Sequence, residues 1–200
     1  MMPHDEDAKR LSENTLTLAE FLVNEAEGYE PPHLEREAIV HGHCHQKATV
    51  GLGAEQELYG KMGLDYEVLD SGCCGLAGSW GFEEDKHDLS MKIGERRLFP
   101  AARDAEQDTI IVGDGFSCKT QIEQGASGGR RALHTAQVIK MALDHGTGGA
   151  PRSEHPEAEY PDVVLDGKSP DLKTAAVVGG ILAGGALVGG ALLRRSGRPQ

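Results

Sequence analysis

The chain has few aromatic residues, fewer basic than acidic residues and no recognisable export signal. Aromatic side chains make up 4% of its 200 residues, so we expect a small and mostly aliphatic core. A formal charge of −12 argues against nucleic-acid-binding proteins, because a phosphate backbone requires a basic surface. The first seven residues are polar and acidic, unlike a secretory signal. We therefore expect a reducing compartment, in which cysteines act as metal ligands or redox centres rather than disulfides.

The sequence also lacks several motifs of common enzyme classes. It contains neither a phosphate-binding loop nor a GxSxG nucleophile motif. Gly51-Leu52-Gly53 lacks the third glycine of a dinucleotide-binding fingerprint. No paired-carboxylate motif stands out from the general acidity. We therefore predict no catalytic acid, base or nucleophile in this chain.

What the chain does contain is an adjacent cysteine pair, Cys73-Cys74, enclosed by Gly72 and Gly75. Two neighbouring thiols rarely serve packing, because they do not both point into one apolar core. Cys44 and Cys118 are the other two cysteines. All four stand next to glycine, histidine or serine on one side at least, which is typical of metal ligands held on loops.

The hydrophobic pattern predicts an α/β domain over residues 1–145. Short apolar runs at 38–40, 66–69 and 109–112 predict three strands. Helical spacing predicts helices over 6–27, through Leu58, through Leu89 to about Pro100, and over 135–143. Alternating strands and helices indicate a short parallel sheet. Every cysteine group follows a predicted strand, so we expect the cysteines to meet at the carboxyl ends of the strands.

Four thiols in this arrangement predict a metal centre. Thiolates bind iron and zinc because the soft sulfur anion donates charge to the metal. Iron–sulfur clusters commonly use four cysteines, so Cys44, Cys73, Cys74 and Cys118 predict an iron–sulfur cluster of the 4Fe-4S type. His43 and His45 flank Cys44 and are further candidate ligands. Hydrogen-bonded or exposed loop histidines are an equally good interpretation, and a mixed cysteine and histidine set would fit zinc.

The last quarter of the sequence has a different composition. Residues 146–173 contain four prolines and six acidic residues, which predicts a linker without regular structure. Residues 174–193 are uncharged and are followed by Arg194 and Arg195. Twenty helical residues span about 30 Å, so we predict a membrane-spanning helix over 174–195, followed by a basic tail at 196–200. A glycine-rich tail is the alternative, because six glycines weaken both helix propensity and hydrophobicity.

Three segments together resemble the cysteine-rich CCG domain family. They are His43 to Lys47, Asp70-Ser71-Gly72-Cys73-Cys74-Gly75 with the residues through Phe82, and Asp114 to Cys118. The family includes a cysteine-rich subunit of heterodisulfide reductase, and the likeness is greatest to the C-terminal part of FAD-linked oxidases. The resemblance covers about residues 5–145. It implies an iron–sulfur site formed by one Cys, a Cys-Cys pair and a Cys-x-x-Cys motif.

Four of the family's five cysteine positions are matched, and Gly115 stands at the fifth. The family also carries two such repeats, whereas this chain has one and no flavin motif. The resemblance thus implies an electron-transfer component of a 2-hydroxy-acid oxidoreductase, as a split or truncated segment. Its expected partners are a flavoprotein carrying the FAD and a second CCG repeat or iron–sulfur subunit.

Two further expectations concern the alternative function and the location of the chain. Zinc at the same cysteines would make this a structural or partner-binding module without redox activity. The predicted C-terminal helix would anchor the chain in a membrane. Arginines after residue 193 favour a cytoplasmic C-terminus, but reduced cysteines and cluster assembly favour a cytoplasmic domain, which we adopt.

Overall fold

A computed structural model describes residues 4–148 and 155–160, which form an α/β domain. Three parallel strands make up the sheet: β1 (Glu37–Val40), β2 (Asp65–Val68) and β3 (Ile110–Val112). Their order is β2-β1-β3, with Glu37 opposite Asp65 and Ala38 opposite Ile110. The predicted α/β class and parallel sheet are confirmed.

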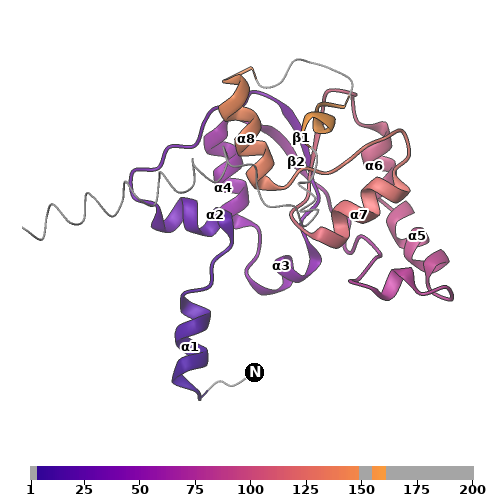
Figure 1. The fold of residues 1–200 in the computed structure, drawn as a ribbon, viewed down its shortest axis with the longest axis horizontal. Coiled ribbons are helices and arrows are strands. Elements are labelled where there is room, and N and C mark those ends of the chain that lie inside the picture. Colours follow the sequence, from indigo (N-terminus) through magenta and orange to yellow (C-terminus); the bar gives the residue numbers. More distant parts are fainter. Residues whose placement is uncertain (1–3, 149–154, 161–200) are drawn as a thin grey trace, which may run out of the picture. The chain divides into compact units, whose positions relative to one another are not determined.

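Helices connect the strands and cover both faces of the sheet (Figure 1). The chain passes from β1 through α3 and α4 to β2, then through α5 and α6 to β3, and continues through α7 and α8. The bounds are α3 (Cys44–Thr49), α4 (Gly53–Met62), α5 (His87–Glu95), α6 (Leu98–Asp104), α7 (Phe116–Gly125) and α8 (Thr135–His145). The predicted helices through Leu58 and over 135–143 correspond to α4 and α8.

Alternating strand residues divide the core into two layers. Ala38, Val40, Ile110 and Val112 belong to one buried cluster, which also contains residues of α4 and α8. Ile111 lies between Ile110 and Val112 in the sequence but belongs to the other cluster. This second cluster contains residues of α6 and α7 together with Cys74 and Cys118. Successive side chains of a strand point to opposite faces, which accounts for the division. The second layer thus contains two of the four cysteines.

The single helix predicted over 6–27 is wrong. The chain forms α1 (Glu6–Glu13), α2 (Leu18–Glu20) and a π-helical turn, η1 (Phe21–Glu25). Thr17 and Glu20 form a capping box that begins α2, because each side chain accepts a hydrogen bond from the other residue's backbone N–H. This local signal outweighs the apolar periodicity across residues 14–17. No residue of α1 is buried.

The predicted helix end near Pro100 is also wrong, because Pro100 lies in the first turn of α6. A first-turn residue has no intrahelical partner for its N–H, so proline is tolerated there. The actual break falls between α5 and α6, at residues 96–97. This bend allows the Phe99 ring to lie against Gly94 and Gly125, where an added Cβ would lie 2.3 and 2.1 Å from ring carbons.

Part of the predicted linker is folded onto the domain. Residues 156–159 form a 3-10 turn, η3 (Pro156–Glu159), in which Glu157 is buried. Arg130 donates from Nε to Glu157 Oε1 at 2.9 Å, and both side chains are inaccessible. The expectation of an unstructured linker therefore fails for residues 155–160.

The predicted membrane-spanning helix at 174–195 and the basic tail lie outside the described residues. Among the residues that the structure describes, no helix is long and apolar enough to cross a bilayer.

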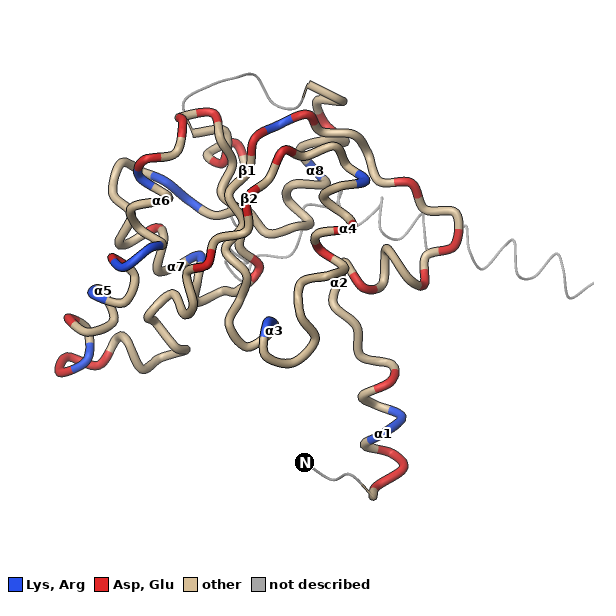
Figure 2. Tube along the Cα trace, turned by 180° about the vertical axis from the view of Figure 1, so that it is seen from behind, with Lys and Arg blue, Asp and Glu red and all other residues tan. Residues whose placement is uncertain are grey.

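Acidic residues are spread over many elements, but they avoid the segments that carry the cysteines (Figure 2). The chain has 32 Asp and Glu residues, yet none lies within 41–54, 71–82 or 115–122. Lys47 is the only charged residue of α3. A cluster of thiolates is itself anionic, so the absence of carboxylates from these three segments lowers the electrostatic cost of bringing thiolates together.

Candidate metal centre

Three loops at the carboxyl ends of the strands carry the cysteines. His41 follows β1 directly, and Cys44 begins α3 three residues later. Cys73 and Cys74 follow β2 after a short loop, while Cys118 lies in the first turn of α7, just after β3. All four cysteines are free thiols in the structure. The predicted arrangement of cysteines after strands is confirmed.

Two glycines shape the loop around the cysteine pair. Gly72 and Gly75 have φ values of 65° and 105°, in the left-handed region that favours glycine. A Cβ at residue 75 would lie 2.2 Å from the carbonyl oxygen of Ser90, whereas one at residue 72 would meet nothing within 4 Å. The Gly75 N–H donates to Cys73 Sγ at 3.3 Å. Gly75 therefore both allows the turn and stabilises the sulfur beside it.

The innermost part of the centre consists of His41, Cys74 and Cys118. These three residues are buried, with exposed fractions of 1%, 2% and 0%. Their candidate ligand atoms all lie within 4.8 Å of one another. Cys44 and Cys73 are partly exposed and lie outside this group, although both are close enough to Cys118 to raise the pKa of its thiol. All four cysteines thus gather at one edge of the sheet, two inside and two toward the surface.

The thiols of Cys73, Cys74 and Cys118 differ in pKa. A hydrogen bond from Cys118 lowers the pKa of Cys74 to about 4, and the nearby His41 ring adds to the lowering, against the opposing effect of burial. The same hydrogen bond, together with burial and the neighbouring thiols, raises the pKa of Cys118. Burial raises the pKa of Cys73, and the Gly75 N–H opposes this. At neutral pH the metal-free centre therefore holds a thiolate at Cys74 and protonated thiols at Cys118 and Cys73.

His41 is the residue that the sequence pattern did not assign to the ligand set. Its Nδ1 lies 2.7 Å from Ser71 Oγ, in the loop after β2. Its buried Nε2 has no hydrogen-bond partner in the described part of the chain. The signal available in the sequence was its position, since His41 follows the last residue of a buried strand, where a side chain is brought to the carboxyl edge of the sheet.

The two histidines named as candidate ligands lie differently. His43 packs against Gly115, where an added Cβ would lie 2.6 Å from His43 Cδ2 and 2.9 Å from Cys118 Sγ. His45 is exposed. The imidazole of His43 therefore occupies the space that a side chain at residue 115 would need. Gly115 stands where the family resemblance places a fifth cysteine, and its φ of −73° is ordinary for any residue.

Two polar residues beside the centre, Asp114 and His134, stabilise the start of α8. The Asp114 carboxylate accepts hydrogen bonds from the Thr135 N–H at 2.6 Å and from its hydroxyl, and so fixes the start of α8. His134 caps the same helix in a capping box with Gln137. These contacts give both residues structural roles.

The residues present fit a metal ion or cluster. Sulfur and imidazole nitrogen are the donors that zinc and iron prefer in proteins, with bonds of about 2.0–2.3 Å for zinc. A histidine that keeps a buried nitrogen without a partner, beside two buried cysteines, is a costly arrangement unless a ligand completes it. The donor set allows either a mononuclear metal or an iron–sulfur cluster.

Comparison with known proteins gives partial matches to oxidoreductases. The chain is 34% identical over 111 residues to one subunit of the anaerobic glycerol-3-phosphate dehydrogenase of Escherichia coli K12. It is 26% and 29% identical over 99 and 101 residues to D-2-hydroxyglutarate dehydrogenases of Pseudomonas putida and Escherichia coli K12. These matches cover 55%, 48% and 49% of this chain. No family model and no solved structure matches the chain.

The relatives are much longer than the matched region. The matches span 27% of the glycerol-3-phosphate dehydrogenase subunit and 9–10% of the two D-2-hydroxyglutarate dehydrogenases. The chain is therefore similar to one segment of each of these dehydrogenase sequences.

Proposed function

We propose that this chain is an iron–sulfur electron-transfer module, formed by a single CCG-type repeat, of an FAD-linked 2-hydroxy-acid dehydrogenase or oxidase. The observation that carries the proposal is the convergence of Cys44, Cys73, Cys74 and Cys118 at the carboxyl edge of the sheet. Four thiols are the usual protein ligand set of a 4Fe-4S cluster, which accepts and releases one electron at a time.

In this proposal the chain holds the sulfurs, excludes water from them and stabilises their negative charge. Buried side chains of the second core layer surround Cys74 and Cys118 on the inner side. The Gly75 N–H donates to the Cys73 sulfur, and such donors stabilise the more negative, reduced state. Partly exposed Cys44 and Cys73 place the outer side of the centre near the surface, where a partner can approach for electron exchange.

The proposal assigns the remaining chemistry to partners. A flavoprotein would carry the FAD and oxidise the substrate, and a second CCG repeat or iron–sulfur subunit would complete the assembly. Two facts support this: one relative is named as a dehydrogenase subunit, and the matched region is a small fraction of each relative.

We further propose that residues 174–195 anchor the chain in a membrane, with the cysteine domain on the cytoplasmic side. The uncharged stretch at 174–193 and the arginines that follow it support the anchor. Fractionation of cells expressing the full chain and a chain ending at residue 173 tests it: only the full chain is expected with the membranes.

Zinc binding without redox activity is the second candidate function. The specific observation in its favour is the group of His41, Cys74 and Cys118, because mixed cysteine and histidine sets are typical of zinc sites. Such a site would stabilise the domain or present a surface to a partner.

Replacing the adjacent cysteines tests the proposal. The full chain with Cys73→Ala and Cys74→Ala is expected to lose its iron and its broad visible absorption when purified without oxygen. Ser79→Ala, an exposed residue of the same loop, is the matched control and is expected to retain both. Unchanged iron content in the double variant would overturn the proposal, and a colourless wild-type chain containing zinc would favour the second candidate.

A further inference from the structure

His41 carries a buried nitrogen that the fold leaves unused. The side chain is 1% exposed, and Nε2 makes no hydrogen bond within the described residues. A buried polar atom without a partner is destabilising, so such atoms normally have a partner. Two sulfurs lie near the His41 ring, because the candidate ligand atoms of His41, Cys74 and Cys118 all lie within 4.8 Å of one another.

The other ring nitrogen is held in a way that fixes the ring. Nδ1 lies 2.7 Å from the hydroxyl oxygen of Ser71, which comes from the loop of the neighbouring strand. If Nδ1–H donates to this oxygen, Nε2 is left with a free lone pair, and the sulfurs of Cys74 and Cys118 are the other candidate ligand atoms of the same group. Metal-bound histidines commonly have their second nitrogen hydrogen-bonded in this manner, which sets both the tautomer and the ring orientation.

We propose that Nε2 of His41 coordinates the metal held by Cys74 and Cys118, and that Ser71 positions the ring. This inference rests on the proposed metal-binding function and, in a centre with four protein ligands, puts a nitrogen in place of one thiolate. His43 and His45, the histidines next to Cys44, lie outside the group formed by His41, Cys74 and Cys118. His43 packs against Gly115, and His45 is exposed.

A nitrogen ligand has a consequence for the redox properties of a cluster. Imidazole is neutral, whereas thiolate is anionic, so replacing one by the other makes the centre less negative. A less negative centre accepts an electron more readily, and histidine ligation raises the reduction potential of iron–sulfur centres. His41→Cys is therefore expected to lower the potential of the iron-loaded protein.

Titration with Co²⁺ tests the assignment on the full metal-free chain. His41→Asn keeps a polar group near Ser71 but removes Nε2, and we expect it to weaken Co²⁺ binding at least tenfold and to shift the ligand-field bands. Ser71→Ala is expected to weaken binding by about 10-fold, as is usual for a group that orients a ligand. His43→Asn and His45→Asn are matched controls from the same segment and are expected to bind within about threefold of wild type.

A second measurement does not depend on whether a variant folds. Wild-type chain with ¹⁵N-labelled histidine, loaded with iron and reduced, is expected to show a strongly coupled histidine nitrogen in pulsed electron paramagnetic resonance. Normal Co²⁺ affinity and bands in His41→Asn, or a centre without a coupled nitrogen, would overturn the inference and leave the proposed function standing. A wild-type chain that binds neither Co²⁺ nor iron would overturn both.

Discussion

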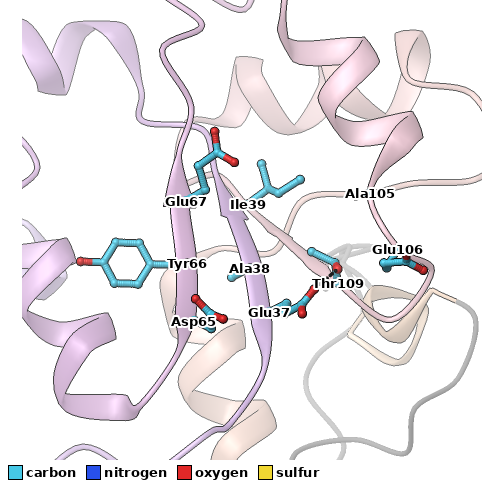
Figure 3. Close-up of a pocket in the computed structure, with 9 residues that line it drawn as sticks. All are labelled: Glu37, Ala38, Ile39, Asp65, Tyr66, Glu67, Ala105, Glu106 and Thr109. Carbon is cyan, nitrogen blue, oxygen red and sulfur yellow. Dashed lines mark hydrogen bonds between the residues drawn. The ribbon is translucent and has the colours of Figure 1, made fainter.

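The two edges of the small sheet differ in chemistry although they are built from the same three strands. The amino-terminal edge has the more open hollow, about 290 Å³, lined by the carboxylates of Glu37, Asp65, Glu67 and Glu106 (Figure 3). The carboxyl-terminal edge has a crowded group of thiols and a histidine, and the segments 41–54, 71–82 and 115–122 that carry them contain no acidic residue.

The difference shows which features indicate a site. The acidic hollow is open to solvent, and among its lining side chains that the structure describes, none leaves a buried polar atom unpaired. The thiol edge has less space, but it buries an unpaired nitrogen and a thiolate with a strongly lowered pKa. A buried polar atom without a partner and a thiol with a shifted pKa indicate a ligand-binding site, whereas carboxylates exposed to water do not.

The largest effect is expected at Gly75, which supports the thiol edge. Gly75→Ala places a Cβ 2.2 Å from the Ser90 carbonyl oxygen at a φ of 105°, so we expect a loss of about 2–4 kcal/mol in the free energy of unfolding. Urea denaturation of the metal-free chain measures it. Gly72→Ala is the matched control, because its Cβ meets nothing within 4 Å; strain at positive φ alone should cost about 1 kcal/mol. Equal losses in the two variants would contradict this account of the loop.

The pH dependence of metal binding gives the next effect. Because the pKa values of Cys118 and Cys73 are raised, a metal must displace their protons at neutral pH, whereas Cys74 is already a thiolate. Binding should therefore weaken as the pH falls, by about tenfold per unit for each proton displaced. Co²⁺ titrations between pH 6 and 8 measure the slope, which Cys118→Ser should reduce. An affinity independent of pH would contradict the proton arrangement.

Introducing a cysteine at residue 115 gives a smaller effect. Gly115→Cys places a Cβ 2.6 Å from the His43 ring, so we expect a loss of about 1–3 kcal/mol in the free energy of unfolding and no additional metal bound. Gly115→Cys with His43→Ala removes the clash with the ring but leaves Cys118 Sγ 2.9 Å from the added Cβ, so part of the stability should return. Denaturation curves and metal content test both variants. A stable single variant with more iron per chain would show that His43 does not exclude the fifth thiolate.

The smallest effect is expected at the acidic edge. Glu37→Gln with Asp65→Asn removes two carboxylates that lie opposite each other in the strand register. We expect unchanged metal content and a change in unfolding free energy within about 0.5 kcal/mol, as for most surface substitutions. Loss of metal from this variant would remove the distinction between the two edges.

The sequence predicted the sheet and the meeting of the cysteines because both follow from one pattern. Each apolar run is short, and each is followed directly by the loop with a cysteine, so parallel strands bring these loops together. Other features depend on contacts between distant segments, which periodicity does not report. The His41 ring is held by its contact with Ser71, and Gly115 is confined by His43 and Cys118.

The helix errors have local causes. The apolar spacing predicts one helix over residues 6–27. Thr17 and Glu20 instead form a capping box that begins a separate helix, a signal that is present in the sequence. Pro100 was interpreted as the end of a helix, although proline is equally suited to a first turn. Glu157 lies in a folded turn because its carboxylate pairs with buried Arg130. Residue composition, on which the linker prediction rests, does not predict this contact.

The metal content of the full chain, purified without oxygen, tests the central claim most directly. Iron, acid-labile sulfide and zinc are measured per chain together with the visible spectrum. The account predicts about four iron and four sulfide with broad visible absorption. A chain with no iron or sulfide would contradict it, and one zinc per chain would assign the thiol edge to structure or partner binding instead.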